Sequence, residues 1–451
     1  MKTSLDEIQT WVPGSHLHGK AVFDGVSTDT RTVGKGNLFV ALKGENFDAH
    51  DFLPEVSGKD VAAVVAERLP EGFSLPALLV KDSRLALGEM ARHWRSRFDL
   101  PVIGVTGSNG KTTVKEMIAA ILRTAYGDAR FLATAGNLNN DIGVPQTLFR
   151  LDDSHRAAVI ELGMNHPGEI AYLAAIAEPT VGLVNNAQRE HQEFMLNVEA
   201  VAKENGSVIQ ALPPDGVAVF PAGDAFSGLW EGYAKETGMR KILTFGFDEG
   251  ASVKGQYDSG SSKLDIHIGG TAVSVQLAVI GQHNAHNALA AAACCHAIGI
   301  EAEVIGKGLE SFLPVNGRLQ KKVAANGARL IDDTYNANPD SVLAAIDVLA
   351  QMDSPRVLVL GDMGEVGNEG SRFHEEIGAY AREKGIDHFF VLGEQVRHAA
   401  RAYGDKARYF EDVVLLTASL REVALPSATI LVKGSRFMKM ERVVNNLVER
   451  E

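Results

Sequence analysis

The chain has 451 residues, of which 45% are hydrophobic, and it carries a formal net charge of −13 at pH 7. This length predicts about three domains of roughly 150 residues each, and the acidic balance argues against nucleic acid as a main partner, because phosphate backbones recruit basic surfaces. No run of about 18 apolar residues is present, so we expect no membrane insertion. The first ten residues carry Asp6 and Glu7 and no apolar core. We therefore expect a cytoplasmic protein without a signal peptide.

Residues 1–84 are predicted to form a small N-terminal α/β domain. Short apolar runs at 38–42, 62–66 and 77–80 are separated by turn residues, which is typical of short strands. A polar cluster that includes Thr28 and Arg31 follows Val26. By itself this cluster is a weak signal, and an N-terminal helix cap explains it as well as a binding role does.

Residues 85–314 are predicted to form a central domain around a mostly parallel, doubly wound sheet. Its apolar strands alternate with helix-compatible sequence, as such a fold requires, and lie at 102–105, 157–161, 181–184 and 216–220. Residues 251–280 indicate an antiparallel appendage, and 287–298 indicate a helix. Cys294 and Cys295 are adjacent within this helix, so they build no disulfide framework, and we expect both to be buried.

The most informative motif is a glycine-rich turn between the strand at 102–105 and a helix predicted over 114–122. It reads Gly104-Val105-Thr106-Gly107-Ser108-Asn109-Gly110-Lys111-Thr112-Thr113. Two glycines let the backbone approach an anion, and the helix N-terminus points N–H groups at it. The lysine is placed to reach terminal phosphates, and the following threonine hydroxyl to bind Mg²⁺. Although Val105 departs from the strict pattern, we favour a nucleotide phosphate site over a plain strand-to-helix turn.

Two side chains near strand ends are candidates for binding the magnesium ion of such a nucleotide. Glu161 ends the strand at 157–161, and His191 follows the strand at 181–184, with Glu190 beside it. Ligands gather at the strand ends of an open parallel sheet, and carboxylates are preferred Mg²⁺ ligands. A solvent-facing acid and a structural histidine are the alternatives, and the neighbouring phosphate loop favours the metal role.

An amide-rich loop follows the predicted phosphate-loop helix. Asn137, Asn139 and Asn140 lie between Gly136 and Gly143. Three amides suit hydrogen bonding to a polar substrate or a phosphate. A turn-rich connection is an equally good explanation, because Asn and Gly dominate turns.

Residues 315–451 are predicted to form a Rossmann-like C-terminal domain without its own lysine-bearing loop. Its apolar strands lie at 330–331, 357–360, 389–392 and 430–432. Asp333 sits at a strand end, where it could bind a ribose hydroxyl or orient a cation. Lys433 and Arg436 precede a predicted helix, and a basic pair at a helix N-terminus favours a bound anion.

Taken together, ordered motifs along the chain resemble those of the Mur ligases. They are residues 106–113, 134–140, 281–284, 317–318, 333–338 and 433–436. The amide-rich loop and the run 335–338 are similar to those of members that add D-alanyl-D-alanine. The members that add diaminopimelate are expected to carry a D-N-P-R motif, and this chain has none.

The resemblance implies a reaction and its substrates. ATP would phosphorylate the C-terminal carboxylate of a UDP-N-acetylmuramoyl tripeptide, and the amine of D-alanyl-D-alanine would attack the acyl phosphate, giving an amide, ADP and phosphate. Mg²⁺ and lysine would offset the repulsion between the two anions. The alternatives are a related ligase that adds a single amino acid, including folylpolyglutamate synthase, and a non-catalytic ATP-driven switch. We expect the protein to act as a monomer.

The resemblance also implies roles for individual residues. Those expected to bind the nucleotide are Gly107, Ser108, Asn109, Gly110, Lys111, Thr112, Thr113, Asn284, Asn287, Arg318 and Asp333. Those expected to bind magnesium are Thr112, Glu161 and His191. Those expected to bind the UDP-linked substrate and the dipeptide are Ser27, Thr28, Arg31, Asn137, Asn139, Asn140, Tyr335, Asn336, Asn338, Ser435 and Arg436. Catalysis would depend on Lys111, Glu161, His191 and Lys203. Lys203 would be the carbamylated lysine of the family, with Asn205 as the alternative occupant of that position.

Overall fold

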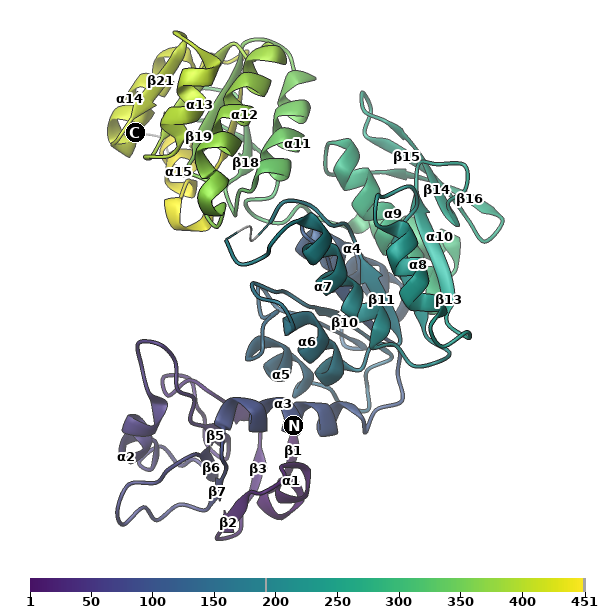
Figure 1. The fold of residues 1–451 in the computed structure, drawn as a ribbon, viewed down its shortest axis with the longest axis vertical. Coiled ribbons are helices and arrows are strands. Elements are labelled where there is room, and N and C mark those ends of the chain that lie inside the picture. Colours follow the sequence, from purple (N-terminus) through teal and green to yellow (C-terminus); the bar gives the residue numbers. More distant parts are fainter. Residues whose placement is uncertain (191–192, 449–451) are drawn as a thin grey trace.

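The computed structural model describes residues 1–190 and 193–448. Its helices and strands fall into three regions that follow one another along the chain, each with sheets of its own (Figure 1). In Figure 1 the N-terminal region (purple) and the C-terminal region (green to yellow) lie toward opposite ends of the long axis, and the central region (teal) lies between them. The predicted α/β class with mostly parallel sheets is confirmed. No described strand crosses residue 84 or residue 314, although the division into domains at these residues stays a prediction.

The N-terminal region combines a two-stranded and a five-stranded sheet. The larger sheet has the order β2-β7-β6-β5-β4, in which only the β2–β7 pair is antiparallel. Phe39 and Val64 from its central strands are fully buried against Leu53. The elements are β1 (Lys2–Ser4), α1 (Leu5–Trp11), β2 (His16–His18), β3 (Val22–Asp24), β4 (Val26–Ser27), β5 (Leu38–Val40), the 3₁₀ helix η1 (Ala49–Phe52), α2 (Leu53–Val56), β6 (Ala63–Ala66) and β7 (Ala77–Leu79).

The central region is built on a nine-stranded sheet with the order β16-β15-β14-β13-β12-β11-β8-β10-β9. It is parallel from β9 to β14, and the last three strands form the predicted antiparallel appendage. The elements are α3 (Ser83–Arg95), β8 (Val102–Thr106), α4 (Lys111–Tyr126), β9 (Phe131–Ala133), α5 (Gly143–Leu148), β10 (Ala157–Glu161), α6 (Glu169–Ala177), β11 (Val181–Val184), α7 (Val198–Gln210), β12 (Val217–Pro221), α8 (Ser227–Lys235), β13 (Lys241–Gly246), β14 (Val253–Asp258), β15 (Lys263–Ile268), β16 (Thr271–Gln276), α9 (Gln282–Ala297) and α10 (Ala302–Ser311).

Helices cover both faces of this sheet, and each face has its own core. Ile103 and Val105 of β8 pack on the side of α4, where they meet Met117. Val102 points to the opposite side and belongs to the core that contains Leu173 of α6. This alternation follows from the two-residue period of a strand. Because both faces are buried, the parallel strands read as continuous apolar runs, which is why the sequence located them well.

Strand order makes one edge of the sheet a natural ligand site. From β8 the chain continues to β9 and β10 on one side, and β11 to β13 lie on the other. Loops after the strands diverge at such a switch point and leave a crevice at the carboxyl ends. The ends of β8, β10 and β11 bring Thr106, Glu161 and the following Asn185 to this crevice.

The C-terminal region has a six-stranded sheet with the order β17-β18-β22-β19-β20-β21, which is parallel except for β17 at its edge. This confirms the predicted second α/β fold. The elements are β17 (Gln320–Val323), β18 (Arg329–Asp333), α11 (Pro339–Ala350), β19 (Arg356–Gly361), η2 (Gly367–Glu369), α12 (Gly370–Glu383), β20 (His388–Leu392), α13 (Val396–Tyr403), β21 (Ala407–Phe410), α14 (Val413–Val423), β22 (Thr429–Lys433), η3 (Arg436–Met438) and α15 (Glu441–Val448).

Two expected helix starts differ from the structure. The helix expected over 287–298 begins earlier, as α9 at Gln282, and it buries Cys294 and Cys295 as predicted. The segment after Lys433 does not open an α-helix directly. It forms the 3₁₀ turn η3, and the left-handed backbone of Lys439 (φ +50°) separates this turn from α15.

Within the described residues, every helix is too short or too polar to cross a membrane.

Candidate active site

The turn between β8 and α4 has the backbone geometry of an anion cradle. Gly107 (φ +137°) and Gly110 (φ +83°) adopt conformations that side-chain-bearing residues rarely take. A Cβ on Gly110 would also clash with Oδ1 of Asn287. Gly110 precedes α4 and offers no side chain to cap it, so the first N–H groups of the helix stay available for an external anion.

Lys111 is folded back over this turn. Its ammonium donates hydrogen bonds to the carbonyl of Gly107 and, at 3.1 Å, to the carbonyl of Ser108. Oε2 of Glu190 lies 3.4 Å from the same nitrogen. The charge therefore sits directly above the turn, where the terminal phosphates of a nucleotide would lie.

Thr112 and Glu161 form the group that fits a magnesium ion. Oε1 of Glu161 accepts hydrogen bonds from the Thr112 hydroxyl at 3.1 Å and from the Asn139 amide at 2.8 Å. Oε2 of Glu161 is buried and has no hydrogen-bond partner among the described residues. A buried carboxylate oxygen without a donor is costly unless a cation compensates it, and Mg²⁺ prefers such oxygens.

No cluster of three or more His, Cys, Asp or Glu side chains with metal-binding geometry occurs within residues 1–190 and 193–448. His191, the third expected metal ligand, lies outside the described residues.

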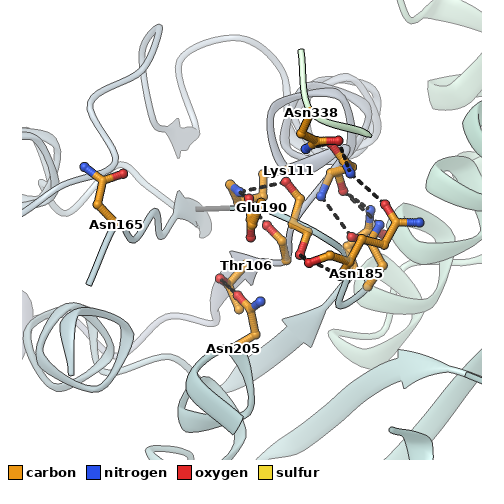
Figure 2. A network of polar contacts seen from close by, with 12 residues as sticks. Thr106, Lys111, Asn165, Asn185, Glu190, Asn205 and Asn338 are labelled. Carbon is orange, nitrogen blue, oxygen red and sulfur yellow. Dashed lines mark hydrogen bonds and ion pairs between the residues drawn. The ribbon is translucent and has the colours of Figure 1, made fainter. Parts of the chain in front are cut away.

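A network of amides supports the turn, and sequence reasoning found only part of it (Figure 2). The backbone N–H of Asn109 donates to Oδ1 of Asn186 at 2.9 Å, and the side-chain amide of Asn109 donates to Gln188 at 2.6 Å. Asn185 donates to Asn287 at 2.9 Å, which joins the loop after β11 to α9. Residues 185, 186 and 188 were not among the predicted site residues. They directly follow the parallel strand β11, and their position at a strand end is the sequence signal that could have identified them.

The C-terminal region reaches the same turn through two side chains. Arg318 donates from Nη2 to the Thr112 hydroxyl at 3.0 Å and stacks over the ring of Tyr335, with 4.1 Å between the guanidinium carbon and the ring centroid. Asn338 donates to Oδ1 of Asn109 at 2.9 Å, and Figure 2 shows Asn338 above the Lys111 side chain. Arg318, which was predicted to bind the nucleotide, thus contacts Thr112, which was predicted to bind magnesium.

Asp333 and Lys433 form an internal pair at the ends of β18 and β22. The Lys433 ammonium lies 2.6 Å from Oδ2 of Asp333 and also donates to the carbonyl of Asn336. Burial raises the pKa of Asp333, and the charge of Lys433 acts in the opposite direction. The Lys433 ammonium therefore holds the Asp333 carboxylate in place. It is not an unpaired cation at a helix N-terminus, where the sequence had suggested an anion site.

A cavity of about 1020 Å³ collects most of the predicted site residues. Predicted residues that line it are Ser108, Asn109, Gly110, Lys111, Thr112, Thr113, Asn137, Asn139, Asn140, Glu161, Asn284, Asn287, Arg318, Asp333, Tyr335, Asn336 and Asn338. Glu45 and Arg84, from the N-terminal region and the start of α3, line its other end. Three regions of the chain therefore share one polar cavity.

The structure does not bring every predicted residue to this cavity. Ser435 is buried and bonded to Gly364 at 2.6 Å, and Arg436 is largely exposed beside Glu441. In the N-terminal region, Thr28 accepts a hydrogen bond from Gln146, Ser27 bonds to Asp29, and Arg31 forms an exposed pair with Asp29. None of the five predicted residues 27, 28, 31, 435 and 436 lines the cavity in the described part of the chain.

Lys203 is placed away from the site, contrary to expectation. Its side chain is 55% exposed on α7 and forms an ion pair with Glu199, one helical turn earlier, at 2.7 Å. Asn205, the alternative, is fully buried and accepts a 2.6 Å hydrogen bond from the Thr106 hydroxyl beneath the turn, as Figure 2 shows. The two residues lie on different faces of α7 because two positions along a helix rotate a side chain by roughly half a turn.

The fold and this site together define a phosphate-loop enzyme whose C-terminal α/β region faces the loop across a polar cavity. The family model described as "Mur ligase middle domain" matches residues 105–295, and that described as "Mur ligase, glutamate ligase domain" matches residues 317–436. The chain belongs to the Mur ligase family.

Relatives with the same overall length support this assignment. The UDP-N-acetylmuramoyl-tripeptide–D-alanyl-D-alanine ligase of Escherichia coli is 39% identical, over 100% of this chain and 99% of the relative. A crystal structure of MurF from Acinetobacter baumannii is 34% identical and superimposes with a TM-score of 0.93, covering 100% and 99% of the two chains. MurF from Thermotoga maritima, solved in complex with ADP, is 27% identical with a TM-score of 0.83, covering 94% and 96%.

Proposed function

We propose that this protein joins D-alanyl-D-alanine to a UDP-N-acetylmuramoyl tripeptide and converts ATP to ADP and phosphate, a step in peptidoglycan precursor synthesis. The activity is the one named for the Escherichia coli relative, which is similar along the whole chain. Because both ATP and the UDP-linked substrate are cytoplasmic compounds, we place the reaction in the cytoplasm. The 39% identity to that relative over the full length also favours this activity over the alternatives of a single-amino-acid ligase and a non-catalytic switch.

One observation carries the proposal. The Thr112 hydroxyl is bonded at the same time to Glu161 of the central region and to Arg318 of the C-terminal region. A group transfer from ATP to a second bound anion requires cationic groups on both sides of the transferred phosphoryl group. Lys111 and Arg318 line the same cavity and would supply them, and Arg318 donates directly to the Thr112 hydroxyl.

The chemistry divides into two steps. An oxygen of the tripeptide carboxylate bonds to the γ-phosphorus of ATP, and the bond from that phosphorus to the bridging oxygen breaks, which releases ADP. The dipeptide amine then bonds to the carbonyl carbon, phosphate leaves, and the amine loses a proton. Lys111 and the N-terminus of α4 would hold the nucleotide phosphates during the first step, and the amides of Asn137, Asn139 and Asn140 would orient the carboxylate.

Magnesium is the cofactor that we assign to Thr112 and Glu161. When bound there, it would neutralise part of the phosphate charge. Glu161→Gln keeps the shape but removes the anionic ligand, so we expect the Mg²⁺ concentration for half-maximal ADP binding, measured by calorimetry, to rise about tenfold or more. Glu199→Gln is the matched control, because Glu199 is exposed on α7. Equal Mg²⁺ dependence in both variants would remove Glu161 from the metal site.

The decisive assay follows ADP release and the amide product together. With UDP-N-acetylmuramoyl tripeptide and D-alanyl-D-alanine, we expect one amide product by mass spectrometry for each ADP released. Replacing the dipeptide with a single amino acid should remove product formation. Equal turnover with a single amino acid, or ATP hydrolysis without an amide product, would contradict the proposal.

A further inference from the structure

Arg189 joins the central region to the C-terminal region through two carboxylates. All three of its guanidinium nitrogens donate to them. Nε and Nη2 bond to Oδ1 of Asp340 at 3.0 and 2.6 Å, and Nη1 and Nη2 bond to Glu376 at 2.7 and 3.1 Å. The backbone N–H of Arg189 donates to the other oxygen of Asp340 at 2.8 Å. The guanidinium also lies 5.3 Å from the centroid of the Phe373 ring.

The segment that carries Arg189 is fastened to the phosphate loop on its other side. Ser108 donates from its backbone to the carbonyl of Asn186, and Gln188 donates from its backbone to the Ser108 hydroxyl at 2.8 Å. Asn109 is held by both Asn186 and Gln188. A displacement of Arg189 would therefore move the loop that holds the nucleotide phosphates.

The partner carboxylate lies at an equally sensitive position. Asp340 is in the first turn of α11, where a negative charge is favourable, and it follows the helix cap Asn338 by two residues. Asn338 is the side chain that bonds to Asn109 of the phosphate loop. By holding Asp340, Arg189 sets where Asn338 meets the loop.

We propose that Arg189 is a positioning residue that clamps the C-terminal region onto the phosphate loop, so that the groups holding ATP and the groups facing the dipeptide are aligned. The inference rests on the proposed function for the reaction that it aligns. Arg189 is distinct from a phosphate ligand because its nitrogens are all committed to Asp340 and Glu376. Without the guanidinium, the carboxylates of Asp340 and Glu376, which both belong to the C-terminal region, would lie close together with no cation between them and repel.

The test compares Arg189→Ala, Glu376→Gln and the double variant with a matched control, Arg397→Ala. Arg397 also forms an ion pair, with Glu411 at 2.7 Å, and its guanidinium lies 4.8 Å from the centroid of the Tyr409 ring. Both of these partners lie within the C-terminal region, as Arg397 does. We expect Arg189→Ala to lower kcat/KM for D-alanyl-D-alanine about tenfold, and Arg397→Ala to stay within about twofold of the wild type.

A double-mutant comparison of Arg189 and Glu376 distinguishes an arginine that clamps two regions from an arginine that binds a ligand. Glu376→Gln should lower kcat/KM in the wild-type background and have no further effect, or a favourable one, when Arg189 is already alanine. Independent, multiplicative effects of the two substitutions would overturn the clamp, as would kinetics of Arg189→Ala equal to those of Arg397→Ala. Arg189→Lys keeps the charge but cannot span both carboxylates, so an intermediate loss is expected, and this variant serves if the alanine variant does not fold.

A second readout does not depend on catalysis. Small-angle scattering of the ligand-free full chain should give a larger radius of gyration for Arg189→Ala than for the wild type, with Arg397→Ala unchanged. If the wild type makes no amide but this difference is present, the proposed function fails and the clamp stands. If the wild type is active and the radii are equal, the clamp fails and the function stands.

Discussion

At the scale of single residues, the site depends on a few groups whose neighbours fix their geometry. Lys111 is held over the turn by two backbone carbonyls, and the Thr112 hydroxyl is shared between Glu161 and Arg318. Such preorganisation lets a charge act on a developing phosphoryl transfer without a rearrangement at the moment of reaction. The consequences of removing each group can therefore be stated separately.

Lys111→Ala is expected to lower kcat by about 10²- to 10³-fold, because it removes the cation above the phosphate cradle. The free energy of unfolding should fall by no more than about 1–3 kcal/mol, because the substitution removes chiefly the hydrogen bonds from the ammonium to the carbonyls of Gly107 and Ser108. Steady-state ADP release and urea unfolding measure the two quantities. Lys203→Ala is the control, expected within about twofold of wild-type activity, because Lys203 is exposed on α7. Retained activity in Lys111→Ala would contradict the phosphate assignment.

Gly110→Ala is expected to abolish ATP binding and to destabilise the protein by more than the backbone strain alone. Gly168→Ala isolates that strain, because Gly168 also precedes a helix in nearly the same backbone conformation (φ +91°, ψ −12° against φ +83°, ψ −4°) and has nothing within 4 Å of the added Cβ. We expect a loss of about 1–2 kcal/mol in the free energy of unfolding for Gly168→Ala and a larger loss for Gly110→Ala, whose Cβ meets Asn287. Equal losses would show that the contact with Asn287 does not matter.

At the scale of secondary-structure elements, α9 links the nucleotide site to stability. It carries His283 and His286 one turn apart. Burial lowers the pKa of each histidine to about 4, with Lys433 adding to the effect at His283. His286 packs against Phe245, with ring centroids 4.8 Å apart. Both imidazoles are therefore neutral in the folded protein at neutral pH.

The sign of the resulting pH dependence follows from these pKa values. Between pH 6.5 and about 4 the unfolded chain binds protons that the folded protein does not. Stability is therefore complete above pH 6.5 and falls as the pH is lowered toward 4. Urea unfolding at pH 7.5 and 5.0 should show this loss, and His286→Gln should reduce the loss by on the order of 1 kcal/mol. A loss of equal size in both proteins would exclude His286 as a contributor.

At the scale of the whole molecule, three regions contribute to one cavity, but their contacts differ in strength. The central and C-terminal regions are joined by Arg189, Arg318 and Asn338. At the edge of the cavity toward the N-terminal region, Arg84 at the start of α3 forms a half-exposed ion pair with Asp141 at 3.2 Å. This exposed pair contributes little. The N-terminal region itself packs on α3 in an apolar core that includes Leu5, Phe23 and Met90, and across the cavity we expect substrate to form the link.

Binding of the UDP-linked substrate is therefore expected to draw the N-terminal region inward. Small-angle scattering should show a smaller radius of gyration with the UDP-tripeptide and a non-hydrolysable ATP analogue than with the analogue alone. An unchanged radius would contradict closure. Sedimentation in the same buffers checks the predicted monomer, since association would enlarge the radius for another reason.

Local chemistry made part of the site readable from the sequence alone. Residues 102–113 comprise a strand, two glycines, a lysine and a threonine that interact with neighbours only a few positions away. The spacing of these residues in the sequence was therefore enough to predict how they lie around a bound anion. Continuous apolar runs located the buried parallel strands for the same reason. Glu161 was foreseen because strand ends meet at one edge of a parallel sheet.

Tertiary structure decided the rest. The rotation of α7 placed Asn205 under the turn and Lys203 in solvent, although both were two positions apart in the sequence. Arg189 finds its partners 151 and 187 residues further along the chain, and no local pattern marks such a pair. Sequence thus determined the groups whose function depends on their immediate neighbours. The packing of one region against another determined which of the remaining charges meet, because that depends on distances between segments far apart in the chain.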